Sequence, residues 1–259
     1  MRKIHDDLVR LVTYNYPPQR MISFDPAITE TLFYLGLEKE VIGRTRFCVH
    51  PSGQVENAVN VGGTKDMKLE RIHELKPDLI IAEKEENTKD MVETLEKHYP
   101  VYVFEVQTVD DGLRMINKLG QLTDQGTAAN ALHSDITAQF THLPKANGKR
   151  IAYLIWKKPY MAVGRDTYIN HLLENLGFVN PFAVSSDRYP IVTESDLQEA
   201  KLDYLFLSSE PYPFRTKHHD EFSAFLPVVQ PVNIDGEMFW YGARMLQAAK
   251  YFQHFMKNL

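Results

Sequence analysis

Cysteine is almost absent from the chain, whose 259 residues include only Cys48. A single cysteine excludes an intrachain disulfide and any zinc site or iron–sulfur cluster built from several cysteines. The formal net charge of −5 excludes the dense positive field that nucleic-acid binding requires. No stretch approaches the ~18 consecutive apolar residues of a membrane-spanning helix. These absences leave a soluble globular protein, and its hydrophobic content of 44% is enough for a substantial core.

A secretory signal is also missing from the first residues. Such a signal has a basic start, then ~7–15 apolar residues and a cleavage site of small residues. Here Asp6, Asp7 and Arg10 interrupt the apolar residues that follow the basic start. The sequence as written therefore predicts a cytoplasmic protein, and a periplasmic or surface-anchored one only if an export signal was trimmed.

Short apolar runs alternate with amphipathic stretches in the first half of the chain. Asp25-Pro26 is typical of a helix start, because it offers an N-cap followed by proline in the first turn, and Gly36 ends the same helix. Strands separated by helices indicate parallel βαβ units. The expected strands are 21–24, 41–43, 79–82 and 101–104, and the expected helices are 26–35, 69–75 and 88–98.

The middle of the chain has helical periodicity and no convincing strand. Apolar residues recur at helical spacing from Val109 to about His142, with room for a break near 123–127. Alternation then resumes. The expected strands are 151–156, 204–207 and 228–234, and the expected helices are 167–176, a short one around 197–200, and 241–259. We predict an α/β lobe over 1–106, an interlobe backbone helix over 107–145 and a second α/β lobe over 146–259.

The two halves repeat one another weakly. A helix ends in Leu-Gly at 35–36 and again at 176–177, and in each half a short helix leads into a buried strand. The predicted fold class is therefore α/β, with two lobes whose central parallel-type sheets are flanked by helices and which are joined by a long backbone α-helix. Such an architecture predicts a cleft between the lobes, where ligands usually bind.

Polar and aromatic residues are concentrated in the loops that follow the predicted strands. Such loops gather at the carboxyl ends of the strands, where open α/β sheets bind ligands. Aromatic rings bury a large area on a flat ligand, and nearby charged groups can orient its polar rim. The candidate ligand-binding residues are Arg46, Phe47, His50, Thr64, Lys65, Glu83, Trp156, Tyr160, Tyr189, Glu210, Tyr212, Asp235, Trp240, Tyr241 and Arg244.

A metal site is one alternative interpretation of these loops. Cys48 and His50 would face the same side of an extended segment, and Glu83 or Glu86 could join them as ligands. The other interpretation is a loop cysteine beside a surface histidine. No closed three-histidine site has support in the sequence.

Enzyme motifs give little support to catalysis. Gly62-Gly-Thr-Lys65 lacks the earlier glycine of a phosphate-binding loop, which favours a turn. Ser208-Ser209 follows a strand without a Gly-x-Ser-x-Gly elbow. Glu210 and Glu237 could still form a carboxylate pair for acid–base chemistry. We predict a non-catalytic protein with no cofactor and no protein-held metal, and a metal-dependent enzyme or metallochaperone using cleft carboxylates is the alternative.

Two segments carry a family resemblance that covers essentially the whole chain. The segment from Arg20 to Glu30, with its Ile-Ser and Pro-x-x-Thr-Glu pattern, resembles the start of the first lobe in cobalamin and iron-siderophore substrate-binding proteins of ABC importers. Leu69-Glu-Arg-Ile and the following Pro-Asp-Leu-Ile-Ile-Ala resemble that family's most recognisable stretch. The loop segments resemble leaderless relatives, often described as helical-backbone metal receptors.

The resemblance implies a ligand held between two lobes that are joined by a rigid backbone helix. The implied ligand is a corrinoid, a heme-like compound or an iron–siderophore chelate, so any metal arrives within the ligand. Phe47 matches an aromatic residue that packs against the corrin in cobalamin binders, whereas Thr64 and Glu83 stand where those binders carry tryptophans. Family importers dock through one carboxylate on each lobe, and Glu70 and Glu194 are the candidates here. We therefore expect a monomer whose partners are a small chelate and an ABC-importer permease.

Overall fold

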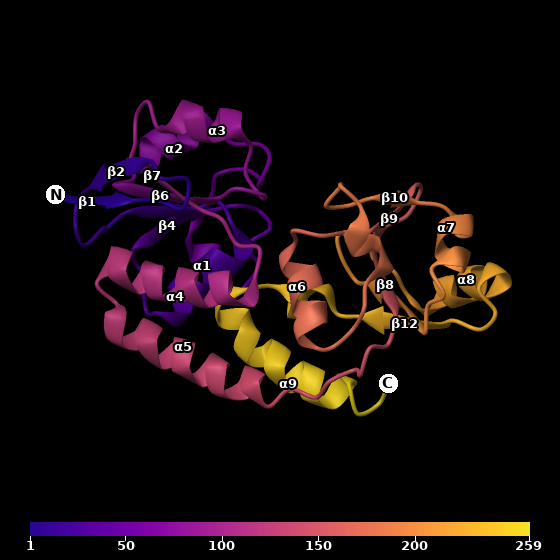
Figure 1. Ribbon diagram of the computed structural model, residues 1–259. Coiled ribbons are helices and arrows are strands. Elements are labelled where there is room, and N and C mark those ends of the chain that lie inside the picture. The colour runs from indigo at the N-terminus through magenta and orange to yellow at the C-terminus, as the bar shows by residue number, and fades with distance from the viewer. The chain divides into compact units, whose positions relative to one another are not determined.

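The computed structural model describes residues 1–259, and the chain forms two compact units. Each unit is built around a five-stranded sheet with helices packed against it (Figure 1). This arrangement confirms the predicted α/β class with two helix-flanked sheets. Unit 1 comprises Met1–Val106, Asp110–Thr137 and Tyr241–Arg244, and unit 2 comprises Gln107–Val109, Ala138–Trp240 and Met245–Leu259.

The sheet of unit 1 is entirely parallel, with strand order β5-β4-β3-β6-β7. Every residue of β6 and β7 is buried, as expected for parallel strands covered on both faces. All four strands predicted for this half are present, and the structure adds the short β5. The strands are β3 (Met21–Ser23), β4 (Val41–Arg44), β5 (Val59–Asn60), β6 (Leu79–Glu83) and β7 (Val101–Phe104).

Helices cover both faces of this sheet, with α2 and α3 on one face and α1 and α4 on the other (Figure 1). The predicted cap starts α1: the Asp25 carboxylate accepts the backbone N–H of Ile28 at 2.7 Å, and Pro26 occupies the first turn. The helices are α1 (Pro26–Tyr34), α2 (Leu69–Leu75), α3 (Lys89–Leu95), α4 (Val109–Thr123) and α5 (Gly126–Thr141), with a 3₁₀ turn at Val55–Asn57.

The segment predicted as a backbone helix forms two helices, α4 and α5. The chain breaks at Asp124, whose φ of 63° lies in the left-handed region, within the stretch where the sequence allowed a break. The two helices pack closely, because a Cβ added at Gly120 would lie 2.4 Å from the Cβ of Ala129. Residues 110–137 of this hairpin belong to unit 1.

A two-stranded hairpin precedes the sheet of unit 1, and the sequence analysis did not predict it. Its strands are β1 (Arg2–His5) and β2 (Leu11–Tyr14), which pair antiparallel. The turn between them is organised by the buried Asp6 carboxylate, which accepts the backbone N–H of Arg10 at 2.9 Å and that of Val103 on β7 at 3.3 Å. The hairpin therefore covers the outer edge of β7, which would otherwise present unpaired backbone groups.

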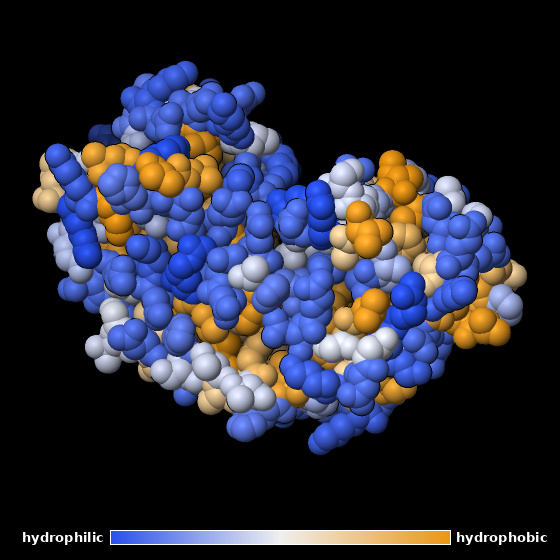
Figure 2. Space-filling view, in the orientation of Figure 1, coloured by the Kyte–Doolittle hydropathy of each residue, from blue (hydrophilic) through white to orange (hydrophobic).

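The same hairpin turn exposes apolar side chains. Leu8, Val9 and Leu11 are 37%, 78% and 58% exposed. Figure 2 shows apolar atoms gathered over one side of unit 1. Val9 also has a φ of 62°, a conformation that a β-branched residue rarely adopts. The backbone of the turn is consequently strained at Val9, and the exposed Val9 side chain makes few contacts that could offset this strain.

Unit 2 has a mixed sheet with strand order β10-β9-β8-β11-β12. Its β8, β11 and β12 are parallel, and β9 and β10 extend the sheet antiparallel. The three parallel strands match the predicted ones, whereas the antiparallel pair was not predicted. The strands are β8 (Ile151–Trp156), β9 (Tyr160–Ala162), β10 (Ile191–Val192), β11 (Tyr204–Ser208) and β12 (Gln230–Ile234).

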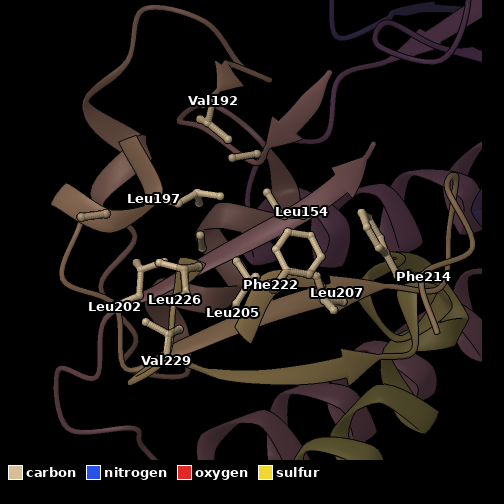
Figure 3. Close-up of a cluster of buried hydrophobic side chains, with 13 residues drawn as sticks. Leu154, Val192, Leu197, Leu202, Leu205, Leu207, Phe214, Phe222, Leu226 and Val229 are labelled. Carbon is tan, nitrogen blue, oxygen red and sulfur yellow. The ribbon is translucent and has the colours of Figure 1, made fainter. Parts of the chain in front are cut away.

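A cluster of buried apolar side chains joins one face of this sheet to the helices beside it (Figure 3). Leu205 and Leu207 contribute from β11, and Phe222 and Leu226 contribute from α8 and its end. The final helix starts later than predicted, because two 3₁₀ turns, Gly236–Phe239 and Gly242–Arg244, precede it. The helices are α6 (Tyr168–Asn175), α7 (Glu194–Glu199), α8 (His219–Phe225) and α9 (Met245–Phe255), with further 3₁₀ turns at Pro181–Val184 and Thr216–His218.

Candidate functional site

The candidate residues of unit 1 lie at the carboxyl edge of its parallel sheet. Asp25 follows β3, the loop 45–50 follows β4 and the loop 84–87 follows β6. Because the strands are parallel, these segments meet at one edge, as the sequence predicted. The Gly62–Lys65 segment is a turn, since the backbone N–H of Gly63 donates to the carbonyl of Asp66 at 2.8 Å.

Asp25 is a buried carboxylate at this edge, with only 2% of its surface exposed. One oxygen caps α1, and the other accepts the hydroxyl of Tyr241 at 2.8 Å. Burial, and then the nearby Glu86 carboxylate, raises the pKa of Asp25 to about 7, although hydrogen bonds from the Ile28 and Ala27 backbone and from Tyr241 act to lower it. The sequence analysis used Asp25 only as a helix cap, and no local pattern shows that this cap is buried beside other acids.

Glu83 is also 2% exposed and organises the loop that follows it. One oxygen accepts the backbone N–H groups of Glu85 and Glu86, at 2.6 and 3.0 Å, and the other accepts that of Val106 at 3.2 Å. Burial, and then the Asp25 carboxylate, raises the pKa of Glu83 to about 8. Both carboxylate oxygens of Glu83 thus accept backbone hydrogen bonds. Contact between Glu83 and a ligand stays a prediction.

Arg46 and Phe47 form the exposed part of the unit 1 edge. The Arg46 guanidinium makes two hydrogen bonds to Asp66, at 2.9 and 2.7 Å, and its central carbon lies 4.9 Å from the centre of the Phe47 ring. Phe47 is 49% exposed, so the other face of its ring is available to a flat apolar partner. Asp66 was absent from the predicted set.

The remaining candidates of this edge differ in exposure. Thr64 is buried, and its carbonyl accepts the side-chain amide of Asn87 at 2.9 Å. Lys65 is exposed and donates to the carbonyl of Glu85, and His50 is half-buried. Thr64 therefore supports the loop framework, whereas Lys65 presents its chain at the surface.

Tyr241 and Arg244 belong to a short segment, Tyr241–Arg244, that packs on α1. Arg244 is 4% exposed and forms an ion pair with Glu30, with an Nε–Oε2 distance of 3.0 Å. The backbone N–H of Ala243 donates to the Thr31 hydroxyl at 2.9 Å. Arg244 was predicted to bind the ligand, but the structure shows it buried as an anchor of this segment, and ligand contact by it stays a prediction.

The candidate residues of unit 2 lie at the corresponding edge of its sheet. Trp156 ends β8 with 40% of its surface exposed, and its ring meets that of Tyr212 edge to face at 5.9 Å between centres. The Tyr160 hydroxyl donates to Glu221 at 2.6 Å, and Lys157 pairs with the same carboxylate. These contacts fix three aromatic rings and one compensated charge pair at this edge.

Two further loops of unit 2 are tied together by hydrogen bonds. The indole N–H of Trp240 donates to Glu210 at 2.6 Å, and the backbone N–H of Gly236 donates to the Ser209 hydroxyl at 2.9 Å. Asp235 is exposed, and Tyr189 is half-buried. The structure therefore shows a hydrogen bond between Glu210 and Trp240. The sequence analysis named both as candidates but did not predict that they are in contact.

The proposed metal ligands do not come together. No group of three or more histidine, cysteine, aspartate and glutamate side chains could hold a metal ion. Cys48 is buried with its sulfur 3.1 and 3.2 Å from the hydroxyls of Thr29 and Thr45, and burial raises the pKa of its thiol. The geometry thus gives the metal-enzyme alternative no support.

The candidate docking residues are both exposed in the first turn of a short helix. Glu70 lies in α2 of unit 1, and Glu194 begins α7 of unit 2. Thr193 and Asp196 form a reciprocal cap at the start of α7, which leaves the Glu194 carboxylate outside the cap. None of the helices has the length and apolar character needed to cross a membrane.

Comparison with known proteins defines the family of this fold. The sequence profile of the periplasmic binding protein family matches residues 21–227, and the chain therefore belongs to that family. Among curated relatives, a vitamin B12-binding protein of Vibrio parahaemolyticus is 28% identical over 205 residues, which cover 76% of this chain and 74% of the relative. A second, from Pectobacterium atrosepticum, is 25% identical over 70% of this chain and 68% of the relative.

Solved structures share the fold at lower sequence identity. The periplasmic vitamin B12 binding protein BtuF of Vibrio cholerae aligns with a TM-score of 0.73 and 22% identity, over 93% of this chain and 98% of the other. The periplasmic heme binding protein HutB of Vibrio cholerae aligns with a TM-score of 0.78 and 21% identity, over 92% and 98%. At this identity the two structures establish the architecture alone.

Proposed function

We propose that this protein is the substrate-binding component of an ABC-type importer. It captures a corrinoid, a heme-like compound or an iron–siderophore chelate, holds it by reversible contacts and changes no covalent bond. Membership of the periplasmic binding protein family is the observation that carries the proposal. The relatives support the ligand class, since they include a vitamin B12-binding protein, a heme-binding protein and a protein described as an ABC-type Fe³⁺-hydroxamate transport system.

The chemistry of the two sheet edges supports this ligand class. Phe47 and Trp156 each leave nearly half of their surface exposed at a carboxyl edge, where flat apolar rings would be expected to stack on a macrocycle. The exposed ammonium group of Lys65, at the same edge as Phe47, can pair with the polar rim of a chelate. The expected position of the ligand between the two units, and the cytoplasmic or exported location of the protein, stay predictions.

Fluorescence titration tests the proposal directly, because the only two tryptophans, Trp156 and Trp240, are both candidate site residues. The purified protein is titrated with cobalamin, cobinamide, heme and a ferric hydroxamate, each with and without EDTA, and binding is confirmed by calorimetry. Saturable binding of one chelate at micromolar or lower concentration, unaffected by EDTA, is the expected result. No saturable binding of any of these chelates, together with a signal that EDTA abolishes, would overturn the proposal.

Alanine variants locate the site within each unit. Phe47→Ala and Trp240→Ala are each expected to weaken binding by about 1–3 kcal/mol, the range for a buried aromatic contact at an interface. Tyr34→Ala is the matched control, because Tyr34 is 52% exposed at the end of α1, away from the carboxyl edge. Unchanged affinity in both test variants would place the site elsewhere.

Docking to a permease is a second element of the proposal. Exposed carboxylates on α2 and α7 would pair with basic groups of the permease, so Glu70→Lys and Glu194→Lys are expected to reduce ligand uptake by cells without changing ligand affinity. Glu38→Lys, at an exposed position in the turn after α1, is the matched control, because it lies on neither of these helices. Normal uptake with both charge reversals would exclude these residues from docking.

A further inference from the structure

The loops that follow β11 and β12 form one hydrogen-bonded framework in unit 2. The Ser208 hydroxyl accepts the backbone N–H of Glu210 at 3.3 Å and lies 3.1 Å from the hydroxyl of Tyr153, which is 1% exposed. The Ser209 hydroxyl accepts the backbone N–H of Gly236 at 2.9 Å. The first loop is therefore attached to the buried core and also to the second loop.

A hydrogen bond between Glu210 and Trp240 attaches the Trp240 ring to this framework. The indole N–H donates to the Glu210 carboxylate at 2.6 Å, and both residues are half-buried. The indole has only one N–H, so this bond sets the direction in which the ring lies.

Gly236 leaves the space that Glu210 needs. A Cβ at position 236 would lie 2.5 Å from the Glu210 Cγ and 2.7 Å from the Ser208 hydroxyl. Side-chain carbon atoms do not approach this closely, so any larger residue would displace the Glu210 side chain. The contacts of Gly236, Ser208 and Ser209 fix the position of the Glu210 side chain. The Glu210 carboxylate in turn fixes the orientation of the Trp240 ring.

We propose that Glu210 is a positioning residue, which holds the Trp240 ring in the orientation that receives the ligand. This inference rests on the proposed function and assigns Glu210 a role other than direct ligand contact. A ring held in place before binding loses less rotational freedom when the ligand arrives, and affinity increases for that reason. The carboxylate acts through the indole N–H, so its role requires an acceptor at this position and does not require a negative charge.

A variant that contains only Trp240 tests the positioning step without any ligand. In Trp156→Phe protein, Glu210→Ala is expected to lower the fluorescence anisotropy of Trp240 and to raise its acrylamide quenching constant about twofold. Glu210→Gln keeps an oxygen that accepts the indole N–H and is expected to preserve both values. Asp220→Ala, which removes an exposed acid of α8, is the matched control. Native anisotropy and quenching in Glu210→Ala would overturn the proposal.

Ligand binding tests the consequence, with hemin and dicyanocobinamide as probes and calorimetry as the measurement. Glu210→Ala is expected to raise the dissociation constant about tenfold, Glu210→Gln less than about threefold, and Gly236→Ala about as much as Glu210→Ala. Equal losses in the alanine and glutamine variants would show that the ligand needs the charge, and wild-type affinity in Glu210→Ala would show that Trp240 needs no positioning. Either result would overturn the inference. If neither probe binds the wild-type protein, the proposed ligand class is wrong. The fluorescence comparison uses no ligand, so it still tests whether Glu210 positions Trp240.

Discussion

The buried carboxylate Asp25 is expected to make unit 1 less stable as the pH rises, and Asp25→Asn should remove that effect. Burial and the Glu86 carboxylate raise the pKa of Asp25 from 3.8 to about 7. The folded protein therefore binds this proton more tightly than the unfolded chain does. Stability contributed by the protonated group is fully present below pH 4 and is lost as the pH rises through about 7.

The size of the effect follows from the two pKa values. Each pH unit between them costs about 1.4 kcal/mol, so the complete loss for Asp25 is at most about 4 kcal/mol. Asparagine is a good N-cap, and its oxygen can still accept the backbone N–H of Ile28. Its amide group can donate to the Tyr241 oxygen, so the variant keeps both contacts without a titrating group.

Urea unfolding followed by circular dichroism at pH 5 and pH 8 measures the effect. The free energy of unfolding of Asp25→Asn should exceed that of the wild-type protein by more at pH 8 than at pH 5, with a difference of about 2–3 kcal/mol, because only about two of the pH units over which the loss occurs lie above pH 5. Asp90→Asn, at an exposed position in the first turn of α3, controls for loss of an unburied acid. Equal changes with pH in the wild-type protein and Asp25→Asn would refute the reasoning.

Three further predictions, which use four substitutions, test local features of unit 1 through its thermal stability. Val9→Asn should stabilise the protein by about 1 kcal/mol, because asparagine tolerates the φ of 62° better than valine and the exposed side chain makes few contacts; a lower melting temperature would contradict this strain. Gly242→Ala should destabilise more than Gly36→Ala, because both glycines have positive φ but only at position 242 would a Cβ meet another atom, at 2.2 Å. Arg244→Ala should cost about 3–5 kcal/mol, because it removes the guanidinium that pairs with the buried Glu30 carboxylate, and a loss below about 1 kcal/mol would show that water reaches this site.

Sequence patterns predicted much of the fold because the information they use is local. The cap at Asp25, the proline that follows it and the glycine at position 36 specify α1 from neighbouring residues alone. Buried parallel strands such as β6 are continuous apolar runs, and these are visible without any partner. The hairpin of β1 and β2 lacked such a signal, because both strands have only four residues and β1 carries charged ones.

The placement of candidates at the strand ends was also predicted, but their individual roles were not. Parallel strands bring their following loops to one edge whatever the loops contain, so the loop positions follow from the fold class. By sequence, Phe47 and Arg244 are equivalent candidates, because both lie in or beside loops rich in polar and aromatic residues. Only packing determines that Phe47 is exposed and Arg244 is buried.

The sequence by itself determined the α/β class, most of the strands and helices, and the loops from which a ligand site can be built. Only the tertiary structure decided that Arg244 pairs with Glu30, that Tyr241 meets Asp25 and that Glu210 holds Trp240. Periodicity and caps depend on residues within a few positions of one another. An ion pair between residues 214 positions apart, or a pKa raised by burial, depends on which surfaces the folded chain brings together.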